Sequence, residues 1–295
     1  MTQARLQDYR LRHRLRVRWA EVDMQRIVFN PHYLMYVDTA FTEYWRALAV
    51  PYEVIPEYFG GDLYVKKSTL EYHGSAELED MLQIGMRCQR IGNSSLAFGA
   101  GVFRGGTLLV GGDLIYVFAD PATQTSKPVP QALRELITAF EAGESMLDLQ
   151  KGGWDVVGSA AAGVRRTVFI EEMELPHTPQ EDAVDHAALH IVVRNRLGLA
   201  LATGRITRES EGCARLGRIA VLRAMRSAGL GRHVVQALLD VAAERGDREV
   251  VLSAQSGACG LYAAVGFQNV SAPYMESGLE HVDMKLELPA QPAKS

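Results

Sequence analysis

Two carboxylates near the front of the chain stand where they could do chemistry. Glu21 and Asp23 are two residues apart, and the segment after them runs through Asn30 into an apolar stretch that begins at Tyr33. We expect a strand to end at the carboxylates and a helix to begin just beyond them, with its free N–H groups and positive dipole end nearby. Such groups can polarise a thioester carbonyl, and a carboxylate can attack its carbon or deprotonate a water. An Asp before a helix is also a common cap or surface residue, so both roles stay open.

A glycine-bearing turn in the second half could bind phosphate groups. Residues 216–221 have the pattern of a strand, and a turn then leads into an amphipathic helix. Backbone N–H groups at such a helix start converge on one point, and glycines let the backbone approach a pyrophosphate closely. The residues of this turn are Arg226, Ala228, Gly229, Gly231 and Arg232. The alternative is a loop with two convenient glycines, but the strand, the arginines and the helix together favour a phosphate site.

The front half has the pattern of a strand, a buried helix and an antiparallel sheet. Residues 11–19 alternate, with Trp19 on the apolar face and arginines on the other, which indicates a half-buried strand. The arginine face could attract anionic phosphates, but a solvated outer face is the more ordinary interpretation. Residues 33–48 are apolar on nearly every side, Leu34 included, which is typical of a buried helix. We expect further strands at 64–72, 81–91, 94–104 and 107–118, and a helix at 130–140.

The second half has a different order of elements. We expect strands at 190–194, 199–206, 214–222, 249–254 and 281–288, with helices at 230–245 and 258–264. Between the halves, the polar and glycine-bearing stretch 144–154 is a plausible linker. The chain has no internal repeat, so two different domains, 1–143 and 155–295, are expected.

Residues 18–40, from Arg18 through the apolar helix, resemble the signature of the 4-hydroxybenzoyl-CoA thioesterase-like branch of the hot-dog family. The resemblance covers about residues 8–140 and implies an antiparallel sheet wrapped around a long helix. Asp23 falls on the family's catalytic aspartate and Glu21 on the acidic position before it. Asn30 stands at the family's polar position, where it could bind the thioester oxygen or a water. The resemblance also implies acyl-CoA hydrolysis at a subunit interface, in a homodimer or homotetramer.

Residues 155–288 resemble small bacterial proteins of the GNAT acetyltransferase superfamily, whose α/β fold has a mixed sheet. Arg226, Gly229 and Gly231 occupy the defining positions of the acetyl-CoA motif. The resemblance implies that the backbone of Ala220 and Val221 holds the pantetheine arm and that Tyr262 protonates the leaving thiolate. Aromatic packing is the alternative role of such a tyrosine. Two weaker candidates for the general base are Glu172 and His281.

Composition limits the other classes of function. The chain has 295 residues and a net charge of −4, which gives no support for a nucleic-acid partner. It has three widely spaced cysteines, which argue against a disulfide framework or a zinc site and fit a reducing cytoplasm. No run of about 18 apolar residues indicates a membrane span, and the N-terminus has no signal-peptide pattern.

These observations predict a bifunctional enzyme with one hydrolysing and one acyl-transferring site. Acyl-CoA or acetyl-CoA is expected as a substrate rather than a tightly bound cofactor, with an amine of unknown identity as the acceptor. In a second interpretation, the rear half is an acetyl-CoA-binding sensor that regulates the thioesterase and transfers nothing. In a third, the front half only dimerises the chain.

Overall fold

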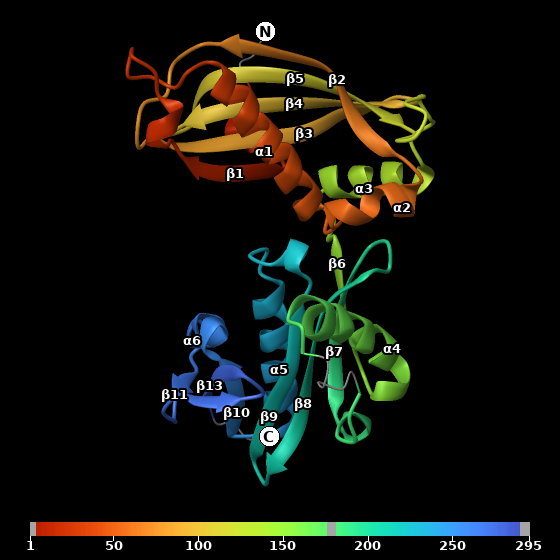
Figure 1. The fold of residues 1–295 in the computed structure, drawn as a ribbon, viewed down its shortest axis with the longest axis vertical. Helices are drawn as coiled ribbons and strands as arrows, with labels where there is room; N and C mark the ends of the chain where they lie inside the picture. Colours follow the sequence, from red (N-terminus) through yellow and green to blue (C-terminus); the bar gives the residue numbers. More distant parts are fainter. Residues whose placement is uncertain (1–3, 176–180, 290–295) are drawn as a thin grey trace, which may run out of the picture. The chain divides into compact units, whose positions relative to one another are not determined.

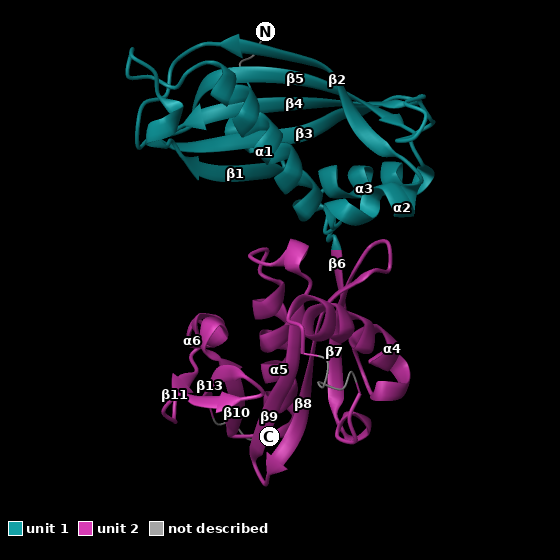
Figure 2. Ribbon diagram, in the orientation of Figure 1, with its two compact units in different colours: residues 1–146 teal, residues 147–295 magenta. Residues whose placement is uncertain are grey.

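The computed structural model describes residues 4–175 and 181–289 and divides the chain into two compact units (Figure 2). The first unit is residues 1–146 and the second is residues 147–295. Each has its own sheet, five-stranded in the first unit and eight-stranded in the second. The two units are therefore described separately.

The first unit is an antiparallel sheet with a long helix across one face (Figure 1). The strand order is β1-β3-β4-β5-β2, so β1 and β2 are the edges. The elements are β1 (Leu11–Arg16), α1 (Pro31–Ala47), α2 (Ile55–Phe59), β2 (Asp62–Tyr72), β3 (Met81–Ile91), β4 (Ser95–Arg104), β5 (Thr107–Ala119) and α3 (Gln131–Glu141), with 3-10 turns at Leu6–Asp8, Trp19–Glu21 and Tyr52–Val54.

An aromatic core joins α1 to the sheet. Phe41 stacks on Tyr116 of β5 with ring centroids 4.0 Å apart, and Phe98 of β4 meets Phe41 edge-on. Tyr44 donates a hydrogen bond of 2.6 Å to Glu141, which ties the end of α3 to α1. The helix begins at Pro31 because the fixed φ of proline suits the first helical position. The expected sheet around one buried helix is confirmed.

Two details of the predicted burial in this unit are wrong. Trp19 is 80% exposed, because β1 ends at Arg16 and the chain turns into a 3-10 helix, which breaks the alternation of faces. Leu34 is 40% exposed, because the apolar circumference of α1 is wider than the strip that faces the sheet.

The second unit is a mixed sheet of order β11-β13-β10-β9-β8-β7-β6, with β12 paired to β13. Among the strand pairs of the described residues 147–175 and 181–289, that of β9 with β10 is the parallel one. The elements are β6 (Leu147–Gly152), α4 (Trp154–Arg165), the π-helical η4 (Arg166–Glu172), β7 (Leu189–Asn195), β8 (Ala200–Ser210), β9 (Cys213–Val221), α5 (Leu230–Arg245), β10 (Glu249–Gln255), α6 (Cys259–Ala263), β11 (Gln268–Asn269), β12 (Tyr274–Glu276) and β13 (Leu279–Glu287), with 3-10 turns at Asp185–Ala187, Arg223–Met225 and Ser256–Ala258.

Helices cover both faces of this sheet. On one face, Val157 of α4 packs against Val192 of β7. Val192 is paired with Thr203 of β8, and the next residue, Gly204, faces the other way. A Cβ at Gly204 would lie 2.7 Å from Val234 of α5, so the glycine lets α5 lie close to the second face.

The segment expected to be a linker is largely a strand. Residues 147–152 form β6, which pairs antiparallel with β7 from Leu147 opposite Asn195 to Gly152 opposite His190. Helix α4 begins at Trp154, so the last residue of the expected linker 144–154 is already helical. The strand escaped prediction because apolar and polar residues alternate only over 147–150 and, at the edge of the sheet, none of the strand's residues is fully buried.

Candidate active sites

The second unit contains a cavity where two neighbouring strands part. Strands β9 and β10 pair in parallel only between Cys213–Arg215 and Glu249–Val251. Beyond that stretch lies a cavity of about 1010 Å³, here called the rear cavity, between β9, β10, η4 and the start of α5. Its wall includes a bulge of β9, where Arg218 has a φ of 53°. Beyond Arg215, the backbone groups of β9 on the β10 side have no strand partner among the described residues.

The glycine turn forms one end of the rear cavity. Gly229 has a φ of 85° and stands at the N-cap of α5, so its backbone conformation is the left-handed one that glycine adopts readily. A Cβ at Gly231 would lie 3.2 Å from the side chain of Leu261, so this glycine lets α5 pack closely against α6. Of the predicted CoA-binding residues, Ala220, Val221, Arg226, Gly229, Gly231 and Arg232 all line the cavity. Ala228 lies in the same turn, but its side chain is exposed and is not part of the lining.

The Arg226 guanidinium in this turn is bound to a carboxylate. It donates two hydrogen bonds to Glu172 of η4, at 2.5 and 2.6 Å, and its Nε donates to the Val221 carbonyl at 3.2 Å. Both partners line the rear cavity. Glu172 was one of two candidates for the general base, but its carboxylate is occupied by the arginine that was expected to meet phosphate.

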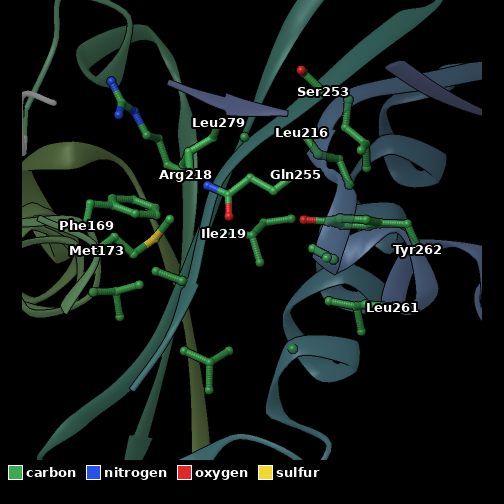
Figure 3. Close-up of a pocket in the computed structure, with 18 of the residues that line it drawn as sticks. Phe169, Met173, Leu216, Arg218, Ile219, Ser253, Gln255, Leu261, Tyr262 and Leu279 are labelled. Carbon is green, nitrogen blue, oxygen red and sulfur yellow. The ribbon is translucent and has the colours of Figure 1, made fainter. Parts of the chain in front are cut away.

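Tyr262 of α6 reaches into the rear cavity with its hydroxyl. Figure 3 shows this hydroxyl pointing towards the space that also holds the side chains of Gln255 and Ile219. The ring itself is only 8% exposed and packs edge-on against Phe267. Burial raises the pKa of Tyr262 to about 12, so the phenol keeps its proton at neutral pH. A protonated hydroxyl in a cavity can donate a proton or a hydrogen bond.

A partly buried ionic cluster supports the wall that carries Arg218. Asp185 accepts hydrogen bonds from Arg165, at 2.9 and 3.0 Å, and from Arg205, at 2.7 Å. Asp182 accepts from Arg205 at 2.6 Å and from Arg218 at 2.9 Å. Burial opposes ionisation of both aspartates, but the hydrogen bonds from these arginines outweigh it and hold the pKa of each below its ordinary value. The cluster therefore fixes the bulge of β9 from behind.

The first unit has a smaller cavity in front of α1. It measures about 420 Å³, here called the front cavity, and brings together Asp23, Asn30 and Tyr72 with their neighbours. Asp23 Oδ1 accepts the backbone N–H of Gln25 at 2.8 Å, which closes a tight loop. The helix cap is therefore not Asp23, because Asn30 occupies the N-cap position of α1.

Asn30 offers polar groups to the front cavity. Its side chain makes no capping hydrogen bond, and among the described residues its backbone N–H has no partner. Its carbonyl accepts the hydroxyl of Tyr72 at 3.3 Å, which brings the end of β2 to the helix start. The front cavity therefore combines one carboxylate with an unpaired N–H group and an amide, and this set can polarise a carbonyl beside an attacking or basic oxygen.

Glu21 has a different environment from Asp23. It is 4% exposed and accepts hydrogen bonds from the Arg18 backbone at 2.8 Å, from the Arg18 side chain at 2.7 Å and from the Tyr36 hydroxyl at 2.7 Å. Burial works to raise the pKa of Glu21, but these hydrogen bonds outweigh it and keep the pKa below its ordinary value. Glu21 is therefore an anchor for the turn before α1 and is not part of the front-cavity lining.

Comparison with known families assigns both units. Residues 25–110 match the family described as "Thioesterase superfamily", and residues 159–288 match the "Acetyltransferase (GNAT) domain". The chain joins a thioesterase-superfamily domain to a GNAT acetyltransferase domain. Both resemblances drawn from the motifs are thereby confirmed, as is the expected pair of folds.

Relatives of the acetyltransferase domain come from distant organisms. A UPF0039 protein of Schizosaccharomyces pombe is 34% identical over 42% of this chain and 84% of its own length. An uncharacterized N-acetyltransferase of Bacillus subtilis is 33% identical over 41% of this chain and 86% of its own. For the thioesterase domain, a solved thioesterase from Thermus thermophilus, crystallised with coenzyme A and Zn, is 26% identical over 46% of this chain and 96% of its own, with a TM-score of 0.41.

Some lining residues of the two domains were not predicted. In the acetyltransferase domain, Gln255 and Arg218 line the rear cavity, and in the thioesterase domain Tyr72 lines the front cavity. Gln255 had a usable signal, because it ends β10 on the same face as the polar Ser253. Arg218 and Tyr72 had no such signal. The bulge that carries Arg218 and the long-range contact that brings Tyr72 to Asn30 leave no pattern in the neighbouring sequence.

Within residues 4–175 and 181–289, no helix has the length and apolar character that crossing a membrane requires.

Proposed function

We propose that the acetyltransferase domain transfers an acyl group from an acyl-CoA, such as acetyl-CoA, to an amine. The observation that carries this proposal is the Tyr262 hydroxyl in the same cavity as the glycine turn of α5. A phosphate site alone supports binding only. A buried phenol that keeps its proton adds the acid that a departing thiolate needs.

The expected path of the substrate follows the strands that part. The pyrophosphate lies on the N–H groups of the α5 first turn, beside Arg226 and Arg232. The pantetheine arm runs along the free edge of β9 at Ala220 and Val221, where backbone groups can bind its amides. The thioester then reaches the space in front of Tyr262, where an amine attacks the carbonyl carbon and the tyrosine protonates the sulfur.

For the thioesterase domain we infer hydrolysis of an acyl-CoA in the front cavity. Asp23 is the group that attacks the thioester or activates a water, and the Asn30 N–H and amide stabilise the oxygen on which negative charge develops. The different surroundings of Asp23 and Glu21 support the choice of Asp23. Asp23 lines the cavity, whereas Glu21 is buried and holds the turn before α1.

A homodimer or homotetramer through the thioesterase domain is part of this proposal. Strand β2 is an edge of its sheet, and most of its residues from Val65 to Tyr72 are exposed in the single chain. The same strand brings Tyr72 to the front cavity, so a copy bound along β2 would lie beside the site.

A sensor remains the competing function of the acetyltransferase domain. The ion pair between Arg226 and Glu172 favours a sensor, because a bound phosphate would compete with Glu172 for Arg226. Release of Glu172 could then change the conformation of η4, which carries it. In this interpretation Tyr262 only packs against the ligand, and no group is transferred.

A crossed assay tests both sites in the full chain. Wild type, Asp23→Asn and Tyr262→Phe are each assayed for acyl-CoA hydrolysis across chain lengths and for acylation of an amine panel by mass spectrometry. We expect Asp23→Asn to lower hydrolysis by about 10³-fold and Tyr262→Phe to lower transfer by about 10²-fold, each leaving the other activity intact. Asp113→Asn, an exposed carboxylate on β5, is the matched control.

The outcomes separate the hypotheses. Hydrolysis retained by Asp23→Asn contradicts the role of Asp23, and no hydrolysis at any chain length by wild type leaves the front half as a dimerisation unit. If wild type binds acetyl-CoA and acylates none of the amines, the sensor explains the rear half better.

A further inference from the structure

We propose that His281 of β13 is the proton acceptor for the amine that is acylated in the rear cavity. This inference rests on the transfer activity proposed above and names the group that reaction still lacks. An amine is protonated at neutral pH and must lose a proton before its nitrogen can attack a thioester.

Few cavity-lining groups can take up that proton. Among the residues that the structure describes, the titratable non-arginine groups of the lining are Glu172, Tyr262, Glu276 and His281. Glu172 is bound through both oxygens to Arg226, and Tyr262 already carries its proton. Glu276 lies on β12, whose three residues are all exposed. His281 is half-buried on β13 and lies on the cavity wall.

The hydrogen bond of the His281 ring decides which nitrogen is basic. Nδ1 lies 3.0 Å from the carbonyl oxygen of Leu279. A carbonyl only accepts hydrogen bonds, so Nδ1 carries the hydrogen in the neutral ring and Nε2 keeps the free lone pair. The ring is therefore oriented and held in one tautomer by its own strand.

The strand register places His281 beside the reacting space. His281 is the direct partner of Gln255 in the antiparallel pairing of β13 with β10. Partners of this kind project to the same side of the sheet, with Cβ atoms roughly 5 Å apart. Figure 3 shows the Gln255 side chain in the cavity near the Tyr262 hydroxyl. A substrate between Gln255 and Tyr262 is therefore within reach of a side chain at position 281.

Tyr274 positions the His281 ring from the other side. The two rings stack with centroids 6.2 Å apart and planes 28° apart. The Tyr274 hydroxyl is 2.6 Å from Ser253 Oγ and donates to Asp283 Oδ1 at 2.8 Å, which fixes the ring on which His281 rests. The charged and titratable groups around His281 are Tyr274, Glu276, Glu280 and Asp283 on the β12–β13 hairpin and Tyr262, Glu172, Arg218, Arg226 and Arg232 along the cavity.

The protons balance with two groups. Transfer breaks the C–S bond of the thioester, forms a C–N bond and removes two protons from the ammonium nitrogen. His281 Nε2 takes the first proton and passes it to solvent. Tyr262 gives its proton to the departing sulfur, and the second proton from nitrogen replaces it on the phenol. The products are the amide, the free thiol of CoA and one proton in solution.

The test uses the full chain with acetyl-CoA and whichever amine of the panel wild type acylates. We expect His281→Gln to lower kcat/KM by about 10²-fold and to remove the fall in rate on the acidic side of the pH profile. The dissociation constant for coenzyme A stays unchanged, which shows that the variant is folded. Added imidazole restores part of the rate to His281→Ala. His73→Gln, an exposed histidine of the other unit, is the control.

Each outcome decides one point. An acidic limb that persists in His281→Gln, or no rescue by imidazole, overturns the assignment of His281 while transfer by wild type stands. No transfer by wild type to any amine overturns the proposed function and this inference together. Tyr274→Phe, which keeps the ring and loses the bonds to Ser253 and Asp283, is expected to lower kcat by a few-fold with the pH profile retained.

Discussion

The residues around the two cavities are held in place by different kinds of interaction. The front cavity is lined by Tyr33 and Tyr72, whose rings meet edge-on, and the buried carboxylate of Glu21 is held by Arg18 and Tyr36. The rear cavity stands on an ionic cluster of three arginines and two aspartates beneath the bulge of β9. The front site therefore depends mainly on aromatic packing, whereas the rear site depends on charge pairs, of which Arg165 and Asp185 are fully buried and therefore costly to separate.

Removing one charge from the rear cluster tests this difference most strongly. Asp185→Asn takes away the carboxylate that the fully buried Arg165 binds. Because a buried guanidinium then loses its counter-charge, we expect the second unit to lose about 3–5 kcal/mol in its free energy of unfolding. Hydrogen exchange read from peptides of β7–β9 measures it, with peptides of β4–β5 as the reference for the first unit.

The control for this prediction is Asp240→Asn on α5, an exposed carboxylate that pairs only with Gln236 among the described residues. A loss below about 1 kcal/mol in Asp185→Asn, the range of surface pairs, would contradict the importance of the cluster.

Acid is expected to weaken the second unit before the first. Burial lowers the pKa of His190, so the folded state favours its neutral form. Stability from this group is complete above the ordinary histidine pKa of about 6.5 and falls as pH drops below it. The lowered pKa values of Asp182 and Asp185 add stability that is complete above about pH 4 and is lost below it.

In the first unit, the lowered pKa of Glu21 acts only in the lower range, below about pH 4.3. Exchange corrected for the intrinsic rate at each pH should therefore show the β7–β9 peptides losing protection first. Replacing His190 by Gln should remove the loss of protection that begins below about pH 6.5. Equal acid sensitivity of both units would contradict the expected difference in their stability.

How much the sequence predicted also differs between the two regions. The helix 230–245 was predicted at its observed bounds, because Gly229 and Gly246 mark its ends and both adopt positive φ. Asp23 and Asn30 were predicted as one site and do line one cavity, since a few residues of loop connect them. These features are local, so their signals lie in neighbouring residues.

Features that join distant residues left no such signal. The Arg226–Glu172 pair spans 54 positions, and each residue alone matched a different expected role. The strand β6 and the bulge at Arg218 depend on pairing with β7 and β8, which a single segment does not encode. Trp19 was placed on the wrong face because the alternation continued past the point where β1 ends.

The smallest expected effect concerns the ion pair between Arg226 and Glu172. Glu172 holds Arg226 at the place proposed for the pyrophosphate, so binding of coenzyme A has to displace the carboxylate or bear its repulsion. The pair is partly exposed and is worth at most about 1 kcal/mol, so Glu172→Gln should tighten coenzyme A binding by roughly threefold to fivefold.

Calorimetric titration measures this change in affinity, with Glu171→Gln, the exposed neighbour, as control. Since salt screens exposed charges, the gain should shrink at high ionic strength. Weaker binding by Glu172→Gln would instead show that the carboxylate holds the turn in its binding shape, and Arg226 would then owe its position in the rear cavity to Glu172.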